Sequence, residues 1–400
     1  MFDALEHLTV IDITEGPCGA YATQLMRDGG ARVIKVEPPR GDYLRLHGLP
    51  SVGGVGADFF ALNRGKESVT LDLATDGGLA ALRRLLANAD VFVEDLGPER
   101  ARELSLDYES LSLKNRGLIQ ATLTPFGEQG PWRDHPGSEL IAQAASDYWS
   151  SLGRIGEPPL RVGADIAYIN SAIFLYQAVL AAIFQRYSTG NGQRVSVNLM
   201  GTLMYTRKTI WTAIYDPDEW AGAHVDNYTN PPSYGYKTKD GFVYFSLRRG
   251  NEEQYYGILD AFGILDRVIT DSRFEDGGRR AVGMGQSAEE VKRIWEEAFA
   301  DKTSAEVVEI LHGFAAEAMP VNNYEQLIGQ EQVKALELIY EIPVPGSGPM
   351  NVLSLPWWAD GVRHHSEALP PSLGEHTQTV LTAAGLSETE IGALTNAAIG

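Results

Sequence analysis

Cysteine is nearly absent from the sequence, since Cys18 is the only one in 400 residues. No intrachain disulfide can form, which excludes the small disulfide-stapled folds and fits the cytoplasmic location that we expect. The first residues lack the basic and apolar regions of a secretory signal. The longest apolar run lies within residues 172–184 and is interrupted by Gln177. A membrane span needs about 20 apolar residues, so we expect no membrane association.

Basic residues are also scarce. The 33 lysines and arginines are outnumbered by 53 aspartates and glutamates, which gives a net charge of −20. Such a surface repels duplex DNA, so we expect no nucleic-acid partner. A small anionic ligand would need a local group of basic side chains or backbone N–H groups. The hydrophobic fraction of 44% is that of an ordinary globular protein, and the length predicts two domains.

The dinucleotide-binding fingerprint G-x-G-x-x-G is missing after the first predicted strand. The turn there reads Glu15-Gly16-Pro17-Cys18-Gly19-Ala20. A second glycine cluster, at residues 53–56, lies in a long loop with no strand directly before it. This pattern disfavours nicotinamide binding.

What the first 125 residues do contain is an alternation of apolar strands and helix-compatible segments. Strands are predicted over residues 8–13, 32–37, 69–73, 90–94 and 117–122, and helices over 19–28 and 77–88. Strands that alternate with helices indicate a parallel sheet with right-handed crossovers. The sequence therefore predicts a Rossmann-like α/β domain.

A different pattern begins after an aromatic, turn-rich stretch at residues 215–232, which indicates a domain boundary. Strands over 234–238 and 242–246, joined through Asp240-Gly241, predict a hairpin. Helices are predicted over residues 252–261, 288–300, 304–318 and 387–396, the last after proline-rich loops. This second domain is predicted to be a smaller α+β domain.

Asp165 stands directly before the longest predicted helix, which runs from Ile166 to Tyr187 without proline or glycine. A glycine-rich stop follows at residues 188–192. Aspartate is a preferred N-cap residue, so one interpretation is that Asp165 only caps the helix. The other is that it is a nucleophile, because the positive end of a helix dipole stabilises the carboxylate anion. Spacing alone favours the cap.

Short blocks along nearly the whole chain resemble the signatures of class III CoA transferases, the formyl-CoA and carnitine CoA-transferase (CaiB/BaiF) type. The N-terminal blocks are Gly30-Ala31-Arg32-Val33-Ile34-Lys35-Val36-Glu37-Pro38 with Gly41-Asp42 and Arg45, then Asn63-Arg64-Gly65-Lys66-Glu67-Ser68-Val69, and Asp90-Val91-Phe92-Val93-Glu94. The later blocks are Phe126-Gly127-Glu128-Gln129-Gly130-Pro131, Ala142-Gln143-Ala144, Thr189-Gly190-Asn191-Gly192-Gln193-Arg194-Val195, and Pro371 with Leu373-Gly374-Glu375-His376-Thr377.

The resemblance implies a fold and a reaction. A discontinuous Rossmann-like large domain would be built from residues 1–215 and 331–400, with a small α+β domain at 216–330, in an interlocked homodimer. The substrates would be an acyl-CoA and a carboxylic acid acceptor, with coenzyme A as the transferred group and no metal. In this family the residue aligned with Asp165 is the nucleophile.

Other site residues follow from the same resemblance. Glu139 matches an acidic position near the nucleophile, and Gly250 lies in the counterpart of a loop that shields the acyl intermediate. The residues expected to contact the CoA nucleotide are Arg40, Lys66, Asp95, Leu96, Arg100 and Arg102. The sequence departs from the family pattern at Asp95, where asparagine is usual, and in the Gly250 loop, which holds a single glycine and two arginines.

Three alternatives share this scaffold or its ligand. An alpha-methylacyl-CoA racemase needs a histidine where this chain has Ser138, and His135 is three positions away. A CoA-ester hydrolase or lyase is compatible with the same residues. A catalytically silent CoA-binding protein is disfavoured by the presence of Asp165. Of the remaining candidates, we expect Cys18 to be a buried structural residue and the His364-His365 pair to lie in a surface loop.

Overall fold

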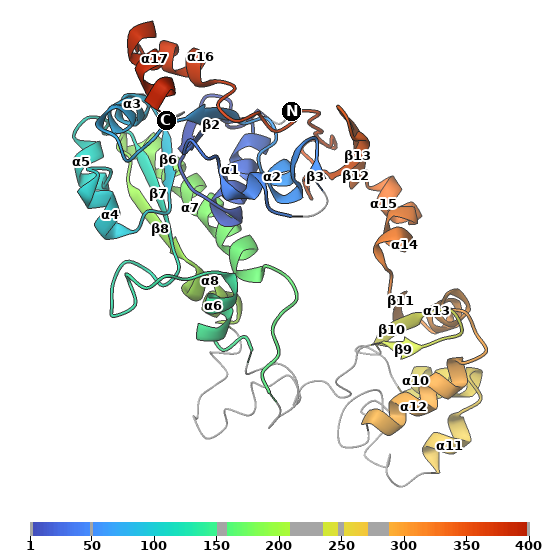
Figure 1. Ribbon diagram of the computed structural model, residues 1–400. Helices are drawn as coiled ribbons and strands as arrows, with labels where there is room; N and C mark the ends of the chain where they lie inside the picture. The colour runs from blue at the N-terminus through green and yellow to red at the C-terminus, as the bar shows by residue number, and fades with distance from the viewer. Residues whose placement is uncertain are drawn as a thin grey trace. The chain divides into compact units, whose positions relative to one another are not determined.

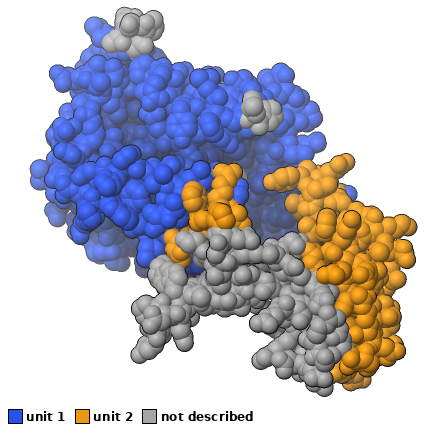
Figure 2. All heavy atoms as spheres, turned by 60° about the horizontal axis from the view of Figure 1, so that its bottom comes forward, with its two compact units in different colours: residues 1–146, 162–208, 332–400 blue, residues 147–161, 209–331 orange. Residues whose placement is uncertain are grey.

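The computed structural model describes residues 3–48, 51–149, 158–208, 235–246, 252–270 and 288–397. The chain divides into two compact units, coloured separately in Figure 2: unit 1 comprises residues 1–146, 162–208 and 332–400, and unit 2 comprises 147–161 and 209–331. The predicted boundary at 215–232 and the loop with Gly250 lie outside the described residues.

Unit 1 is built on a six-stranded sheet in which every neighbouring pair is parallel, as predicted (Figure 1). The order is β5-β2-β1-β6-β7-β8. The strands are β1 (Thr9–Asp12), β2 (Arg32–Glu37), β5 (Glu67–Thr70), β6 (Val91–Glu94), β7 (Ile119–Thr124) and β8 (Arg194–Asn198). β6 and β7 are buried along their whole length. Their buried polar side chains are paired with one another, since Gln120 and Thr122 both donate to the Glu94 carboxylate.

Helices lie between these strands and after the last of them along the chain. The longer ones are α1 (Pro17–Asp28), α3 (Asp76–Leu86), α7 (Ile166–Thr189) and α8 (Leu199–Thr206). The shorter ones are α2 (Ala57–Leu62), α4 (Pro98–Glu103), α5 (Tyr108–Ser112), α6 (Glu139–Ala145) and α16 (Thr377–Ala383), and α17 (Glu388–Ala397) ends the described chain. The predicted stop of α7 is confirmed, since Gly190 adopts the left-handed conformation, with φ of 72°.

The strand order reverses between β1 and β6. From β1 the chain proceeds outward through β2 and β5, whereas β6, β7 and β8 extend the sheet in the other direction. The backbone N–H of Ile13, after β1, donates to the carbonyl of Val93 at 3.0 Å, so the carboxyl ends of the two strands adjoin. Ligands of open α/β sheets bind outside the carboxyl ends at such a reversal.

Helix α7 is longer than its apolar run suggested. By length and composition alone it could cross a membrane, with a mean hydropathy of 1.7 over its most apolar window. In the structure it packs against α1, α8, β7 and β8, and it buries Leu175 and Val179. These contacts bury one side of α7 within unit 1.

A buried cluster of charges joins the start of the sheet to the motif that contains Lys66. The Lys35 ammonium lies 2.9 Å from the Asp42 carboxylate and 3.9 Å from that of Asp12. The Lys66 ammonium is 3.5 Å from Asp12, and Thr23 donates its hydroxyl hydrogen to Asp12 at 2.6 Å. Several of the residues that carry the family resemblance are thus used to hold the fold.

The charge cluster predicts a dependence of stability on acid pH. Burial alone would raise the pKa of Asp12, but Lys35 and Lys66 lower it from 3.8 to about 2. A pKa that is lower in the folded chain stabilises the fold above pH 3.8, and this contribution is lost as the pH falls towards 2. The shift corresponds to about 2 kcal/mol. We expect Asp12→Asn to be destabilising at pH 6, and the difference in unfolding free energy from wild type to shrink by about this amount at pH 2.5. Denaturant titrations at both pH values measure it, and a difference that does not change with pH contradicts it.

A second buried ion pair fixes the C-terminal segment to unit 1. Arg45 donates two hydrogen bonds to the Glu37 carboxylate, both at 2.7 Å, and a third to the carbonyl of Pro371 at 3.1 Å. Burial raises the pKa of Glu37, but Arg45, with further hydrogen bonds from Ser68 and the backbone of Asp42, lowers it overall. The Ser68 hydroxyl accepts from the backbone N–H of Gly374 at 2.9 Å. The C-terminal motif is therefore held against β5 by hydrogen bonds to Arg45 and Ser68.

Proline-rich loops were predicted before the last helix, and this is wrong for residues 339–353. They form the antiparallel hairpin of β12 (Ile339–Val344) and β13 (Gly348–Leu353). Pro343 and Pro349 lie directly opposite each other in it. A two-stranded ribbon has a free edge on both sides, so a proline without an N–H is tolerated there. The two short strands β3 (Ser51–Val52) and β4 (Val55–Gly56) form another such ribbon.

Unit 2 contains the predicted hairpin of β9 (Tyr236–Lys237) and β10 (Phe242–Ser246). Helices α10 (Glu252–Ala261), α11 (Leu265–Ile269), α12 (Ala288–Phe299) and α13 (Ser304–Gly313) follow, and α14 (Tyr324–Gly329) and α15 (Glu331–Ala335) lead out of the unit. The helix predicted to reach Ala318 ends at Gly313 instead. The chain turns at Ala315, with φ of 55°, and β11 (Glu317–Pro320) then pairs with β10.

Candidate active site

The first turn of α7 is capped from another helix. Asp165 occupies the N-cap position with φ of −79° and ψ of 60°, yet its side chain makes no capping hydrogen bond. The backbone N–H groups that an N-cap side chain normally satisfies belong to Ala167 and Tyr168. Both donate instead to Glu139, at 2.8 Å and 2.7 Å. The interpretation of Asp165 as the capping side chain is therefore wrong.

Glu139 is held firmly in this role. It is the first residue of α6, only 5% exposed, and its carboxylate also accepts from the side-chain amide of Gln143 at 2.6 Å. Gln143 is one turn further along α6 and fully buried, and it also reaches the carbonyl of Ala164 at 3.3 Å. Glu139 is thus bonded to the backbone directly after Asp165, and Gln143, which donates to Glu139, is bonded to the backbone directly before it.

The consequence is a carboxylate that is exposed and close to the positive end of a long helix dipole. Among the described residues, no hydrogen bond or ion pair engages the Asp165 side chain. The carboxylate therefore has an oxygen available to attack an electrophile. This arrangement fits covalent catalysis better than it fits a structural role.

Cys18 and Tyr43 lie beside Tyr168, which is in the first turn of α7. The Cys18 thiol donates to the carbonyl of Tyr168 at 3.4 Å. Burial raises the pKa of this thiol, and Asp95 and Glu139 raise it further. Cys18 is therefore an unreactive buried residue, as predicted. Burial also raises the pKa of the Tyr43 hydroxyl to about 12, with a further contribution from Tyr168. The sequence had not marked either tyrosine.

The predicted nucleotide contacts Asp95 and Leu96 lie at the reversal of strand order, directly after β6. The Asp95 carboxylate is exposed and accepts from the backbone N–H of Glu15, after β1, at 3.2 Å. The backbone N–H of Leu96 donates to the buried Glu94 at 2.9 Å. Gly97, which follows with φ of 76°, turns the chain into α4.

The three arginines predicted to contact phosphates are exposed, and each already has a partner. Arg40, which follows β2, makes two hydrogen bonds of 2.8 Å and 2.7 Å to Glu15. On α4, Arg100 pairs with Glu103 at 2.9 Å and Arg102 donates to the carbonyl of Pro98 at 2.9 Å. The exposed pairs Arg40–Glu15 and Arg100–Glu103 exchange readily with solvent. All three arginines follow strands at the carboxyl edge of the sheet.

Lys66 has a different environment from the one predicted. Its side chain is fully buried, and the ammonium donates to the carbonyl of Ala20 at 2.9 Å and to Thr23 and Asn63 at 2.8 Å each. Burial lowers the pKa of Lys66 to about 7, and Asp12 opposes this only in part. In this conformation no face of the ammonium is open to a phosphate.

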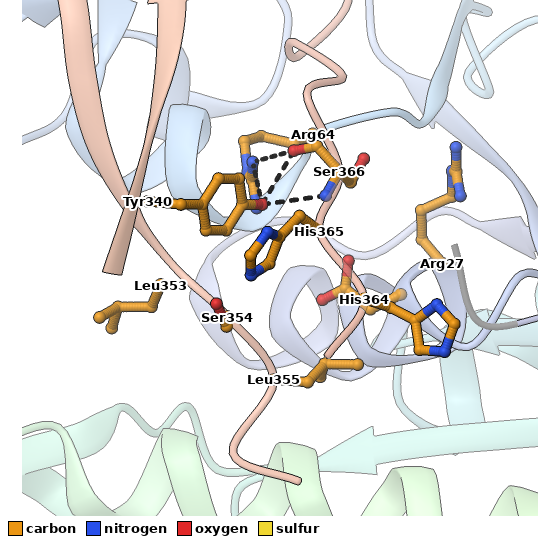
Figure 3. Close-up of a pocket in the computed structure, with 10 residues that line it drawn as sticks. Arg27, Arg64, Tyr340, Leu353, Ser354, Leu355, His364, His365 and Ser366 are labelled. Atoms are coloured by element: carbon orange, nitrogen blue, oxygen red, sulfur yellow. Dashed lines mark hydrogen bonds between the residues drawn. The ribbon is translucent and has the colours of Figure 1, made fainter. Parts of the chain in front are cut away.

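The His364-His365 pair lies in a loop, as predicted, and lines a small concavity of unit 1 (Figure 3). The His365 ring stacks on that of Tyr340, with centroids 4.3 Å apart. Beside them Arg64 donates to the carbonyl of Ser366 at 2.9 Å. The concavity has a volume of about 20 Å³, which is room for little more than one water molecule. Asp165 does not line it.

Comparison with known proteins assigns the chain to a family. The model of CoA-transferase family III matches residues 5–377, nearly the whole length. The chain belongs to that family. It is therefore an enzyme that transfers coenzyme A, as the sequence blocks predicted.

Sequence similarity to known CoA-transferases extends over most of the length of both chains. Mouse succinyl-CoA:glutarate CoA-transferase is 29% identical over 94% of this transferase and 85% of its own chain. Formyl-CoA:oxalate CoA-transferase of Streptomyces avermitilis is 28% identical over 98% of both. Among solved structures, a CaiB/BaiF family protein from Brucella suis superimposes with a TM-score of 0.81 at 26% identity, covering 94% of this transferase and 98% of that chain.

Proposed function

We propose that this transferase moves CoA from an acyl-CoA donor to a carboxylic acid acceptor through covalent intermediates on Asp165. The observation that supports the proposal most is that Glu139, and not Asp165, caps the start of α7. Glu139 accepts the two N–H groups that a capping aspartate would use, and the Asp165 carboxylate is left exposed, with no bond to any described residue. A residue kept only as a cap would accept those bonds itself.

In the first half of the proposed reaction, a carboxylate oxygen of Asp165 attacks the thioester carbon of the donor. A carbon–oxygen bond forms and the carbon–sulfur bond breaks, which gives a mixed anhydride and the CoA thiolate. The thiolate then attacks the Asp165 carbonyl carbon of the anhydride. The donor's carboxylate leaves, and Asp165 becomes an aspartyl-CoA thioester.

In the second half, the acceptor carboxylate attacks that thioester, so a second anhydride forms and CoA thiolate is released again. Attack of the thiolate on the acceptor's carbonyl gives the new acyl-CoA and restores the Asp165 carboxylate. Two covalent stages replace one slow attack of a weak carboxylate on a thioester. No proton has to be stored, because acids enter and leave as anions.

The nucleotide part of CoA would lie along the carboxyl edge of the sheet. Asp95 and Leu96 adjoin the reversal of strand order, and Arg40, Arg100 and Arg102 follow strands on the same edge. A phosphate offers each arginine a stronger partner than an exposed carboxylate does. Lys66 would act on this site only through the fold, because its ammonium is buried.

We also propose a homodimer, with a second copy of the chain covering the exposed apolar face of α7. Within unit 1, Phe184 is 77% exposed, Tyr187 68% and Ile169 42%, although α7 is the most apolar long helix. On α8 the ring of Tyr205 is 56% exposed and lies against Phe174 of α7, with centroids 5.5 Å apart. Aromatic patches of this kind are typical of obligate interfaces. The cytoplasm is the proposed location.

Intact-protein mass spectrometry with a panel of acyl-CoAs tests the covalent step. We expect wild type to gain the mass of an acyl group or of CoA, and hydroxylamine to remove it, because anhydrides and thioesters are both cleaved by that nucleophile. Asp165→Asn should gain nothing, since its amide cannot attack. The donor that gives the largest adduct identifies the acyl group.

Asp134 provides a matched control, because it is an exposed aspartate outside the site and pairs with Arg133. Asp134→Asn should form the adduct as wild type does. An adduct on Asp165→Asn, or none on wild type with any donor that the enzyme turns over, would disprove the covalent role of Asp165.

A further inference from the structure

A second concavity lies between α3 and α5, at the end of the sheet opposite Asp95. It has a volume of about 250 Å³. The last turn of α3 leads directly into β6, and the turn after α5 leads into β7, so the concavity adjoins the amino ends of these parallel strands. Figure 1 shows α3 and α5 on the same flank of the sheet. None of the predicted site residues lines it.

The floor of this concavity is apolar and its rim is basic. Leu86 and Leu111, both buried, lie at the bottom. Arg83 and Lys114 stand at the rim, and no aspartate or glutamate of the described part of the chain lines the concavity. On a chain with a net charge of −20, two cations without a lining carboxylate are a local exception.

Both cations have N–H donors without a hydrogen-bond partner among the described residues. Among the described residues, no hydrogen bond or ion pair engages the Lys114 ammonium. Arg83 uses one terminal nitrogen on the carbonyl of Leu104, which fixes the guanidinium and leaves its other donors free. An anchored arginine beside a free lysine is a suitable pair for a carboxylate.

A serine at the rim adds a hydroxyl group from a residue in the left-handed backbone conformation. Ser105 has φ of 52° and closes α4, with Leu106 bonded back to Ala101 at 2.8 Å. Glycine normally fills this left-handed position because it has no side chain. Here the strained residue carries an exposed hydroxyl that lines the concavity.

We propose that this concavity is a second binding site, which takes a small organic carboxylate with an apolar body. The carboxylate would pair with Arg83 and Lys114 and the hydrocarbon part would cover Leu86 and Leu111. The volume is below that of a drug-sized pocket, which limits the ligand to a short acid. Because the site adjoins the amino ends of the strands, its ligand does not touch Asp165.

Calorimetric titration of the full chain with hexanoate, butyrate and inorganic phosphate at pH 7 tests the proposal. We expect hexanoate to bind about 15-fold more tightly than butyrate, since each buried methylene contributes about fourfold. Phosphate should bind most weakly, because it has nothing to place on the apolar floor. Added CoA and the Asp165→Ala substitution should change hexanoate affinity by less than about twofold.

Two variants locate the site. Lys114→Gln should weaken hexanoate at least about tenfold, since it removes a charged hydrogen bond. Ala87→Trp, which fills the concavity from its exposed rim, should abolish binding while leaving CoA transfer unchanged. Lys237→Gln, at an exposed lysine of unit 2, is the matched control and should bind as wild type does.

Competition by CoA, or equal binding of phosphate and hexanoate, would overturn the proposal, since these results indicate the active site or an unspecific attraction to cations. Unchanged binding in Ala87→Trp with a wild-type melting temperature would overturn it as well.

Discussion

Replacement of Asp165 by alanine or asparagine should lower CoA transfer by at least about 1,000-fold and leave the fold intact. In the proposed mechanism this substitution removes the covalent nucleophile and with it the whole two-stage route, and effects of this order or larger are usual for such residues. The unfolding free energy should change by less than about 1 kcal/mol. The Asp165 side chain makes no capping bond, so only its interaction with the helix dipole is lost.

Asp107 supplies the control for the small change in unfolding free energy that we expect at Asp165. It is the N-cap of α5, and its side chain does accept from the backbone N–H of Ser110, at 3.0 Å. Asp107→Ala should cost about 1 kcal/mol and leave transfer unchanged. Steady-state kinetics and denaturant titration on both variants decide the matter. A destabilised Asp165→Ala that retains activity would return Asp165 to a purely structural role.

The sequence predicted many helices and strands of unit 1 well, because they depend on local patterns. Strands rich in valine and isoleucine between turn residues were recognisable, and the six residues of β2 were located to the residue. The end of α7 was equally clear, because Gly190 can adopt a left-handed conformation at little cost. The hairpin of β12 and β13 was missed because its prolines resemble loop residues unless the strands are known to be edges.

The site was only half predictable, for a physical reason. Asp165 was predicted from its place before a helix together with the family blocks, and its catalytic role stays a prediction. The environment of Lys66 was not, because nothing in a sequence distinguishes a lysine that meets a phosphate from one buried on Thr23 and Asn63. The bonds from α7 to Glu139 join residues 28 and 29 positions apart. No local spacing encodes such a contact.

The capping by Glu139 leads to a prediction that a structural carboxylate alone would not produce. Glu139→Ala should lower the unfolding free energy by about 3 kcal/mol, because two N–H groups lose a charged acceptor in a buried place. It should also lower CoA transfer strongly. Ala167 and Tyr168 are the second and third residues of α7, so their freed N–H groups are the ones that the Asp165 side chain can reach as an N-cap.

The test is a double-mutant cycle of Glu139→Ala and Asp165→Ala, measured by denaturant titration. In the wild-type background Asp165→Ala should change stability by less than about 1 kcal/mol, since the Asp165 side chain makes no hydrogen bond or ion pair with the described residues. In the Glu139→Ala background the same substitution should cost about 1 kcal/mol more than that, because there Asp165 has become the cap. Additive effects would mean that Asp165 does not take over the N–H groups. Glu139 would then act on catalysis by some route other than keeping the nucleophile free of its own helix.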